Sequence, residues 1–183
     1  SDLVSALIVT LPYPISANRY WRTRVITTKK GPPIVSTYVS PEAKQYKESV
    51  GWLLKAKGVR DVLPGRMTVH LRLYPNRPQD YRTRMRKHGD LWDDSVMRLD
   101  LDNARKVVYD ALKDIVFADD KCIFKDTGEV MEPDGREACV MVAIEPYVRT
   151  PTYQTVLDLP APKPVLKVIE PDPKQQRMLE TPF

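Results

Sequence analysis

The chain has 183 residues, of which 42% are hydrophobic, so it can bury one well-formed core, and its formal net charge of +5 suits a polyanionic partner. No apolar run approaches the roughly 20 residues of a membrane-spanning helix, which argues against a membrane role. No glycine-rich phosphate loop is present, which argues against a nucleotide cofactor and an ATP-driven motor.

The N-terminal half predicts a strand, a hairpin, a helix and a second strand. Ala6 to Leu11 is predicted as the first strand, and a hairpin is expected around Lys29 to Pro33. A helix is predicted from Pro41 to Lys57, because a proline stands in its first turn behind a Ser40 cap and apolar residues recur at helical spacing. Met67 to Tyr74 alternates apolar and polar residues, which is typical of a strand.

A basic and aromatic loop lies between the first strand and the hairpin. Arg19 and Arg22 flank Tyr20 and Trp21. Basic residues interleaved with aromatic ones can hold a nucleic-acid backbone and stack on exposed bases. We expect the two arginines to contact phosphates and the two aromatic rings to pack inward.

The segment 77–97 carries basic residues followed by acidic ones. Such a run is typical of a solvated loop, but Asp80 is the one counter-charge within the basic part, and DNA contact is the interpretation we favour. Asp93 and Asp94 are interpreted as surface residues, because no strand, helix and second acidic pair follow them in a repeated layout. The residues expected to bind DNA here are Arg82, Arg84, Arg86 and Lys87.

The most informative stretch contains Asp100 and Asp102 and is followed, after one short helix, by Asp119 and Asp120. Two carboxylates about 4 Å apart repel by roughly 4 kcal/mol near a protein surface, and a divalent cation removes this cost. Mg²⁺ takes oxygen ligands, usually one or two carboxylates with waters and phosphate oxygens. Asp100 and Asp102 fit this arrangement if the segment is extended, because alternate side chains of a strand point the same way.

A helix is predicted after this acidic pair, with apolar residues at three- and four-residue spacing from Ala104 to Ile115 and with Asp102 or Asn103 as its cap. Lys106 lies one turn from Asp102 and can reach a phosphate bound there. Taken singly, Asp102 is simply a cap, Asp110 a surface ion pair with Lys106 and Lys113, and Asp119 with Asp120 a turn. Taken together, the pattern favours a catalytic site.

Two further strands are predicted near Ile123 and from Glu137 to Tyr147, the first of which would return the second acidic pair to the first. Cys122 and Cys139 lack zinc-site spacing, and we expect them to be reduced and to lie on neighbouring strands. The fold class expected is α/β (α+β), a small mixed sheet with two main helices packed on one face.

Residues 1–147 are expected to form one domain, and residues 148–183 a proline-rich tail that is extended or disordered. Val165 to Ile169 is the apolar patch of this tail and is a candidate edge strand.

The acidic pattern resembles the RusA family of Holliday junction resolvases. Leu11 to Arg22 is similar to the family's Pro-x-Ser-x-Asn-x-x-Trp-Arg element, and Val39 to Tyr46 resembles the opening of its first helix. The resemblance spans roughly residues 7 to 147. It implies a small homodimeric Mg²⁺-dependent endonuclease, in which Mn²⁺ can substitute, acting in the cytoplasm of a bacterial host cell.

Carried over residue by residue, the resemblance implies that Asp100, Asp102 and Asp120 are the metal-binding carboxylates, supported by Asp119, and that Lys106 meets the phosphate. Two arginines beside the acidic pair, Arg98 and Arg105, are also expected to bind DNA. The expected reaction is in-line attack of a water on phosphorus in a four-way junction, leaving 5′-phosphate and 3′-hydroxyl ends. A non-catalytic branched-DNA-binding protein and a broader structure-selective nuclease are the alternatives.

Overall fold

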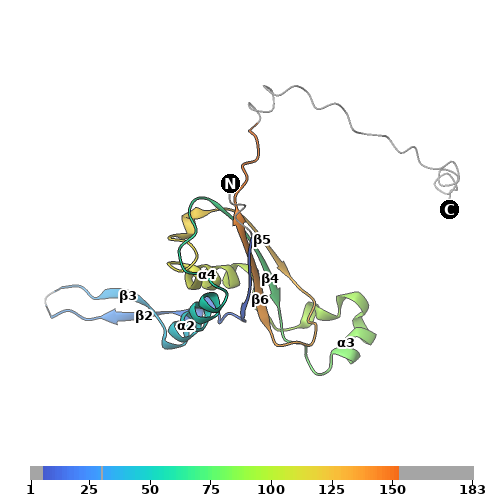
Figure 1. The fold of residues 1–183 in the computed structure, drawn as a ribbon. Coiled ribbons are helices and arrows are strands. Elements are labelled where there is room, and N and C mark those ends of the chain that lie inside the picture. Colours follow the sequence, from blue (N-terminus) through green and yellow to red (C-terminus); the bar gives the residue numbers. More distant parts are fainter. Residues whose placement is uncertain (1–5, 30, 153–183) are drawn as a thin grey trace. The chain divides into compact units, whose positions relative to one another are not determined.

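A four-stranded mixed sheet forms the centre of the protein in the computed structural model, which describes residues 6–29 and 31–152 (Figure 1). The strand order is β1-β6-β4-β5, and β6 runs antiparallel to both of its neighbours, whereas β4 and β5 are parallel. The strands are β1 (Leu7–Pro12), β4 (Met67–Tyr74), β5 (Ile123–Val130) and β6 (Cys139–Pro146). This mixed sheet confirms the expected α+β class.

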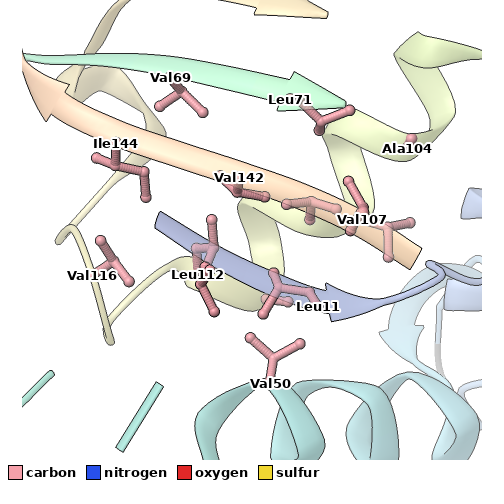
Figure 2. Packing of buried hydrophobic residues seen from close by; sticks show 14 of the residues in the cluster. Leu11, Val50, Val69, Leu71, Ala104, Val107, Leu112, Val116, Val142 and Ile144 are labelled. Atoms are coloured by element: carbon pink, nitrogen blue, oxygen red, sulfur yellow. The ribbon is translucent and has the colours of Figure 1, made fainter. Parts of the chain in front are cut away.

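Two long helices, α2 (Pro41–Ala56) and α4 (Leu101–Leu112), pack on one face of this sheet. Figure 2 shows Val50 of α2 opposite Leu11 of β1, and Val107 of α4 belongs to the same buried cluster as Val142 of β6. All four side chains are at most 1% exposed. The helices α2 and α4 therefore close the core on one side of the sheet, as expected.

Local chemistry sets where α2 begins. Ser40 Oγ accepts a hydrogen bond from Ala43 N at 3.1 Å, and Pro41 occupies the first helical position. A proline there loses no hydrogen bond, because the first backbone N–H groups of a helix have no intrahelical partner. The predicted helix boundary is confirmed to within one residue.

The predicted hairpin is a two-stranded antiparallel ribbon of β2 (Trp21–Ile26) and β3 (Ile34–Val39), separate from the main sheet. A single helical turn, α1 (Ala17–Tyr20), leads into it. Figure 1 shows the ribbon extending away from α2 and the sheet.

The segment interpreted as a charged loop is helical instead, forming α3 (Tyr81–His88) and a 3-10 helix, η1 (Gly89–Ser95). Trp92 is 2% exposed and its Nε1 donates to Glu132 Oε1 at 2.7 Å. Arg84 joins the two pieces, since its Nε lies 2.9 Å from Asp80 Oδ1 and its Nη1 donates to Ser95 Oγ. The charge pattern of the segment did not predict these helices, because the segment is anchored by one buried residue, Trp92.

Cys122 ends a short 3-10 helix, η2 (Asp120–Cys122), and Cys139 begins β6. Both cysteines are free, but they do not lie on neighbouring strands, because η2 stops before β5 begins and β5 pairs with β4.

The described residues up to Val148 belong to one compact unit, and the domain boundary at 147 remains a prediction. The candidate edge strand at Val165 to Ile169 lies outside the described residues. Among the described residues, no helix has the length and apolar character needed to cross a membrane.

Candidate active site

The first acidic pair lies at the beginning of α4. Asp100 is the N-cap, and its Oδ1 accepts a hydrogen bond from Asn103 N at 2.7 Å. Asp102 follows within the first helical turn. The extended arrangement expected for this pair is therefore wrong, and the cap is Asp100 rather than Asp102 or Asn103, because this carboxylate satisfies a backbone N–H that the helix leaves unpaired.

Lys106 is paired with Asp102 as the one-turn spacing predicts. Its Nζ lies 2.7 Å from Asp102 Oδ2. The Asp102 carboxylate, with a smaller contribution from Asp100, raises the pKa of Lys106. The lysine is therefore a fixed positive charge beside the acidic pair, and both paired side chains remain more than half exposed to solvent.

Asp110 is not the surface partner of Lys106 and Lys113. Its Oδ2 accepts a hydrogen bond from the Tyr20 hydroxyl and lies 3.2 Å from Lys47 Nζ. Burial, and then this hydrogen bond, raise the pKa of Tyr20. The phenol is therefore neutral, and the contact fixes α1 against α4.

A second contact between α1 and α4 was also missing from the sequence analysis. Asn103 Oδ1 accepts a hydrogen bond from Ala17 N at 2.6 Å, across 86 positions of sequence. An Asp-Asn pair near a helix start predicts a cap but gives no sign of a distant backbone partner.

The second acidic pair lies in the turn between α4 and β5. Asp119 is the cap of η2, where its Oδ1 accepts from Lys121 N at 3.0 Å, and Asp120 is the first residue of η2. The Lys121 N–H is the main cause that lowers the pKa of Asp119. Lys113 Nζ lies 3.5 Å from Asp119 Oδ2. Since Lys113 is the C-cap of α4, this ion pair holds Asp119 at the C-terminal end of the helix.

A groove of about 400 Å³ runs along the exposed side of α4, and Asp102, Lys106 and Lys113 border it at helical spacing, together with Asp120. From Asp102 to Lys113 the helix rises by about 16 Å, at 1.5 Å per residue. Because Asp119, the neighbour of Asp120, is paired with Lys113, Asp102 and Asp120 border the groove toward its opposite ends. The full lining is Trp21, Asp102, Arg105, Lys106, Tyr109, Asp110, Lys113 and Asp120.

Among residues 6–29 and 31–152, no three His, Cys, Asp or Glu side chains come close enough to hold a metal ion. A cage of Asp100, Asp102 and Asp120 is thus not formed within the described part of one chain. The donor chemistry still fits a hard cation, because Asp102 and Asp120 are exposed carboxylates on the same groove and Mg²⁺ is often held by only one or two carboxylates.

Residues 12–145 match the family model of endodeoxyribonuclease RusA. The chain belongs to the RusA endodeoxyribonuclease family. This RusA-family protein is a nuclease that acts on DNA by phosphodiester hydrolysis, and its family supports Holliday junctions as the class of substrate. RusA resolvases are generally metal-dependent. No curated protein matches the sequence.

The basic residues expected to bind DNA in this RusA-family nuclease have different surroundings. Arg19 and Arg22 are both exposed and lie 3.8 and 3.4 Å from the Glu42 carboxylate. Arg105 borders the groove, with its Nε 3.3 Å from Asp126 Oδ2 but without hydrogen-bond geometry. Arg84 is engaged within its own segment. The remaining ones, all exposed, are Arg82, Arg86, Lys87 and Arg98.

Of the two aromatic residues expected to pack inward, Tyr20 is fully buried. Trp21 is only partly buried and borders the groove, with its ring centroid 4.5 Å from that of Tyr20. The inward prediction is therefore confirmed for Tyr20 and only partly for Trp21.

Proposed function

We propose that this protein is a Mg²⁺-dependent Holliday junction resolvase that makes paired nicks in four-way DNA junctions, acting as a homodimer in the cytoplasm of a bacterial host cell. The observation that carries the proposal is the groove on α4, where Asp102 and Asp120 share one surface with Lys106 and Lys113. A pure DNA binder gains nothing from carboxylates beside a phosphate, because they repel it.

Asp100, Asp102 and Asp120 would hold the metal, supported by Asp119. When bound, Mg²⁺ or Mn²⁺ supplies positive charge that lowers the pKa of water and stabilises the leaving oxygen. Asp100 Oδ1 already accepts the cap hydrogen bond from Asn103 N, so Oδ2 is the oxygen of this carboxylate that is not used by the cap.

Lys106 would neutralise charge on the phosphate, since its ammonium lies at the groove surface. Its present partner is Asp102, so a phosphate entering the groove would share the lysine with that carboxylate.

The distance between the two acidic ends favours a site completed by a second copy. In a two-fold homodimer, paired surfaces meet in opposite directions, so the Asp102 end of one groove can face the Asp120 end of its partner. Two equivalent centres result from one symmetry operation, which suits a junction that must be cut in two strands. We therefore propose that each metal site of the homodimer combines Asp102 of one chain with the second-pair aspartate of its partner.

Arg105 borders the groove, Arg98 lies two residues before Asp100, and Arg19 and Arg22 lie on either side of Tyr20 and Trp21 in the chain. All four would contact the phosphate backbone. Arg82, Arg86 and Lys87 would extend this contact along α3, and Arg84 would contribute by holding α3 to η1.

A cleavage assay tests the activity. A labelled four-way junction and a linear duplex of matched sequence are incubated with Mg²⁺, using the wild type, Asp102→Asn and the control Asp61→Asn, which changes an exposed aspartate outside the groove. We expect paired junction nicks that Asp102→Asn lowers by at least about 100-fold and Asp61→Asn leaves unchanged. Equal cleavage of both substrates would instead indicate a broader nuclease, and binding of the junction without cleavage a non-catalytic protein.

A mixing experiment tests the shared site. Asp102→Asn and Asp120→Asn are each expected to be inactive alone, but a mixed dimer carries one centre with both wild-type aspartates if the two come from different chains. Mixing should therefore restore nicking, and Mn²⁺ binding measured by calorimetry should return to one ion per mixed dimer. If each site lay within one chain, mixing would restore neither.

A further inference from the structure

The β2–β3 ribbon is a basic surface of the domain that lies outside the groove, apart from Trp21 at its base. Apart from their mutual pairing, its strands contact the rest of the described domain mainly at their base, through α1. The register pairs Val25 with Val35 and Ile26 with Ile34 at the distal end. Figure 1 shows that this end lies well away from the sheet and from α4.

The charge of the ribbon has one sign. Its described residues, 21–29 and 31–39, include Arg22, Arg24 and Lys29 and no carboxylate. Arg22 approaches Glu42 at the base, whereas the Arg24 guanidinium lies 5.5 Å from the centre of the exposed Tyr38 ring. Such a uniformly basic projection is complementary to a phosphate backbone.

The distal half of the ribbon is also apolar on both of its faces. Val25 and Val35 are 64% and 66% exposed, and Ile34 is 56% exposed. A two-stranded ribbon that buries neither face is marginally stable by itself in water. Exposed apolar side chains on a basic projection are expected where a surface binds a partner.

The ribbon is fixed in direction by the helix that carries Asp102. Trp21, its first residue, borders the groove, and the preceding turn is held to α4 by the contacts of Ala17 with Asn103 and of Tyr20 with Asp110. Six residues of strand extend by about 20 Å. At 3.4 Å per base pair this reach corresponds to about six base pairs of duplex from the edge of the groove.

We propose that the β2–β3 ribbon binds the duplex arm of the DNA substrate next to the cleavage point. Arg24 and Lys29 lie against its phosphates, and the apolar pairs lie in a groove of the arm, where a major groove has the width for a two-stranded ribbon. The inference rests on the proposed function for the identity of the substrate. It adds that substrate selection includes a length of duplex that the acidic groove does not touch.

The test measures binding of the full-length protein without divalent metal. The Arg24→Ala/Lys29→Ala double variant is compared with Lys57→Ala/Arg60→Ala, which removes the same charge from exposed positions at the far end of α2. The probes are four-way junctions with arms of about 15 or about 4 base pairs, longer and shorter than the ribbon's reach. For long arms we expect weaker binding by the ribbon variant and a salt slope reduced by about 2, since each phosphate contact contributes about 0.9.

For short arms we expect the ribbon variant and the control to bind equally. An unchanged salt slope on long arms, or an equal loss on short arms, would overturn the proposal. A Val25→Ser/Val35→Ser variant gives a further test. If this variant sediments as a monomer where the wild type is a dimer, yet binds long arms as the wild type does, the apolar pairs dock on a second copy and the proposal is overturned.

The two proposals fail separately. A wild type that binds long arms through the ribbon but never cleaves them overturns the nuclease residues and supports the ribbon. If the wild type cleaves junctions but the ribbon variant has an unchanged salt slope, the nuclease proposal is supported and the ribbon proposal is overturned.

Discussion

Replacing Tyr20 by phenylalanine isolates one hydrogen bond that joins the base of the ribbon to α4. The Tyr20 ring is fully buried, so phenylalanine keeps the packing and removes only the hydroxyl that donates to Asp110. A hydrogen bond to a charged group contributes about 1.5 to 3 kcal/mol. Asp110 keeps its contact with Lys47 at 3.2 Å and is 27% exposed, so we expect the low end, about 1.5 kcal/mol of unfolding free energy at pH 7.

The loss of unfolding free energy in Tyr20→Phe should become smaller as the pH rises above about 10. Burial and the Asp110 hydrogen bond raise the pKa of Tyr20 above its usual value of 10.0, so the folded protein retains the phenol proton more strongly than the unfolded chain. The stabilisation is present in full below about pH 10 and is lost as the pH rises through the folded pKa. Phenylalanine has no such proton, so the difference between variant and wild type should narrow above pH 10. Tyr46 and Tyr109, whose pKa values are also raised, titrate equally in both proteins.

Urea denaturation at pH 7 and above pH 10 measures both effects, and the variant's slope with denaturant should match that of the wild type. Tyr38→Phe serves as the control, because Tyr38 is 41% exposed, and we expect little change. A Tyr20→Phe protein as stable as the wild type at pH 7 would contradict the reasoning. A difference that widens with rising pH would do so as well.

Three further substitutions test the site and the fold. Lys106→Ala should lower the rate of single-turnover junction cleavage by about 10² to 10³, as for loss of one charge-stabilising donor, and a wild-type rate would exclude the lysine from catalysis. Leu112→Ala should cost about 2 to 5 kcal/mol in chemical denaturation because Leu112 is fully buried, whereas Leu53→Ala, at a site 39% exposed, should cost clearly less. Ser40→Ala should cost about 1 kcal/mol through loss of the α2 cap, and an unchanged midpoint would show that the cap contributes nothing.

Most elements of the fold follow from local sequence. The strand from Met67 to Tyr74 and the helix after Ser40 were predicted closely, because alternation, helical spacing and capping involve residues that are neighbours in the chain. The acidic motif likewise indicated the family, which the match over residues 12–145 shows.

The errors have a common physical origin. Spacing of two suggested an extended pair at Asp100 and Asp102, but Asp100 caps α4 and Asp102 enters its first turn. Both geometries are compatible with two carboxylates separated by one residue, and the choice depends on where the following helix begins. The charged segment around Trp92 was likewise not predicted as helical, because the buried indole that anchors it donates to Glu132, which is 40 residues away in the chain.

By itself the sequence determined the periodic elements, the caps with good signals and the set of acidic and basic residues available for DNA chemistry. The tertiary structure alone decided that Asp110 pairs with Tyr20 and that Asn103 holds Ala17. It also decided that Asp102 and Asp120, one from each acidic pair, border the same groove. These contacts join residues far apart in the chain, and their formation depends on how α1, α4 and the sheet pack, which no local pattern of residues encodes.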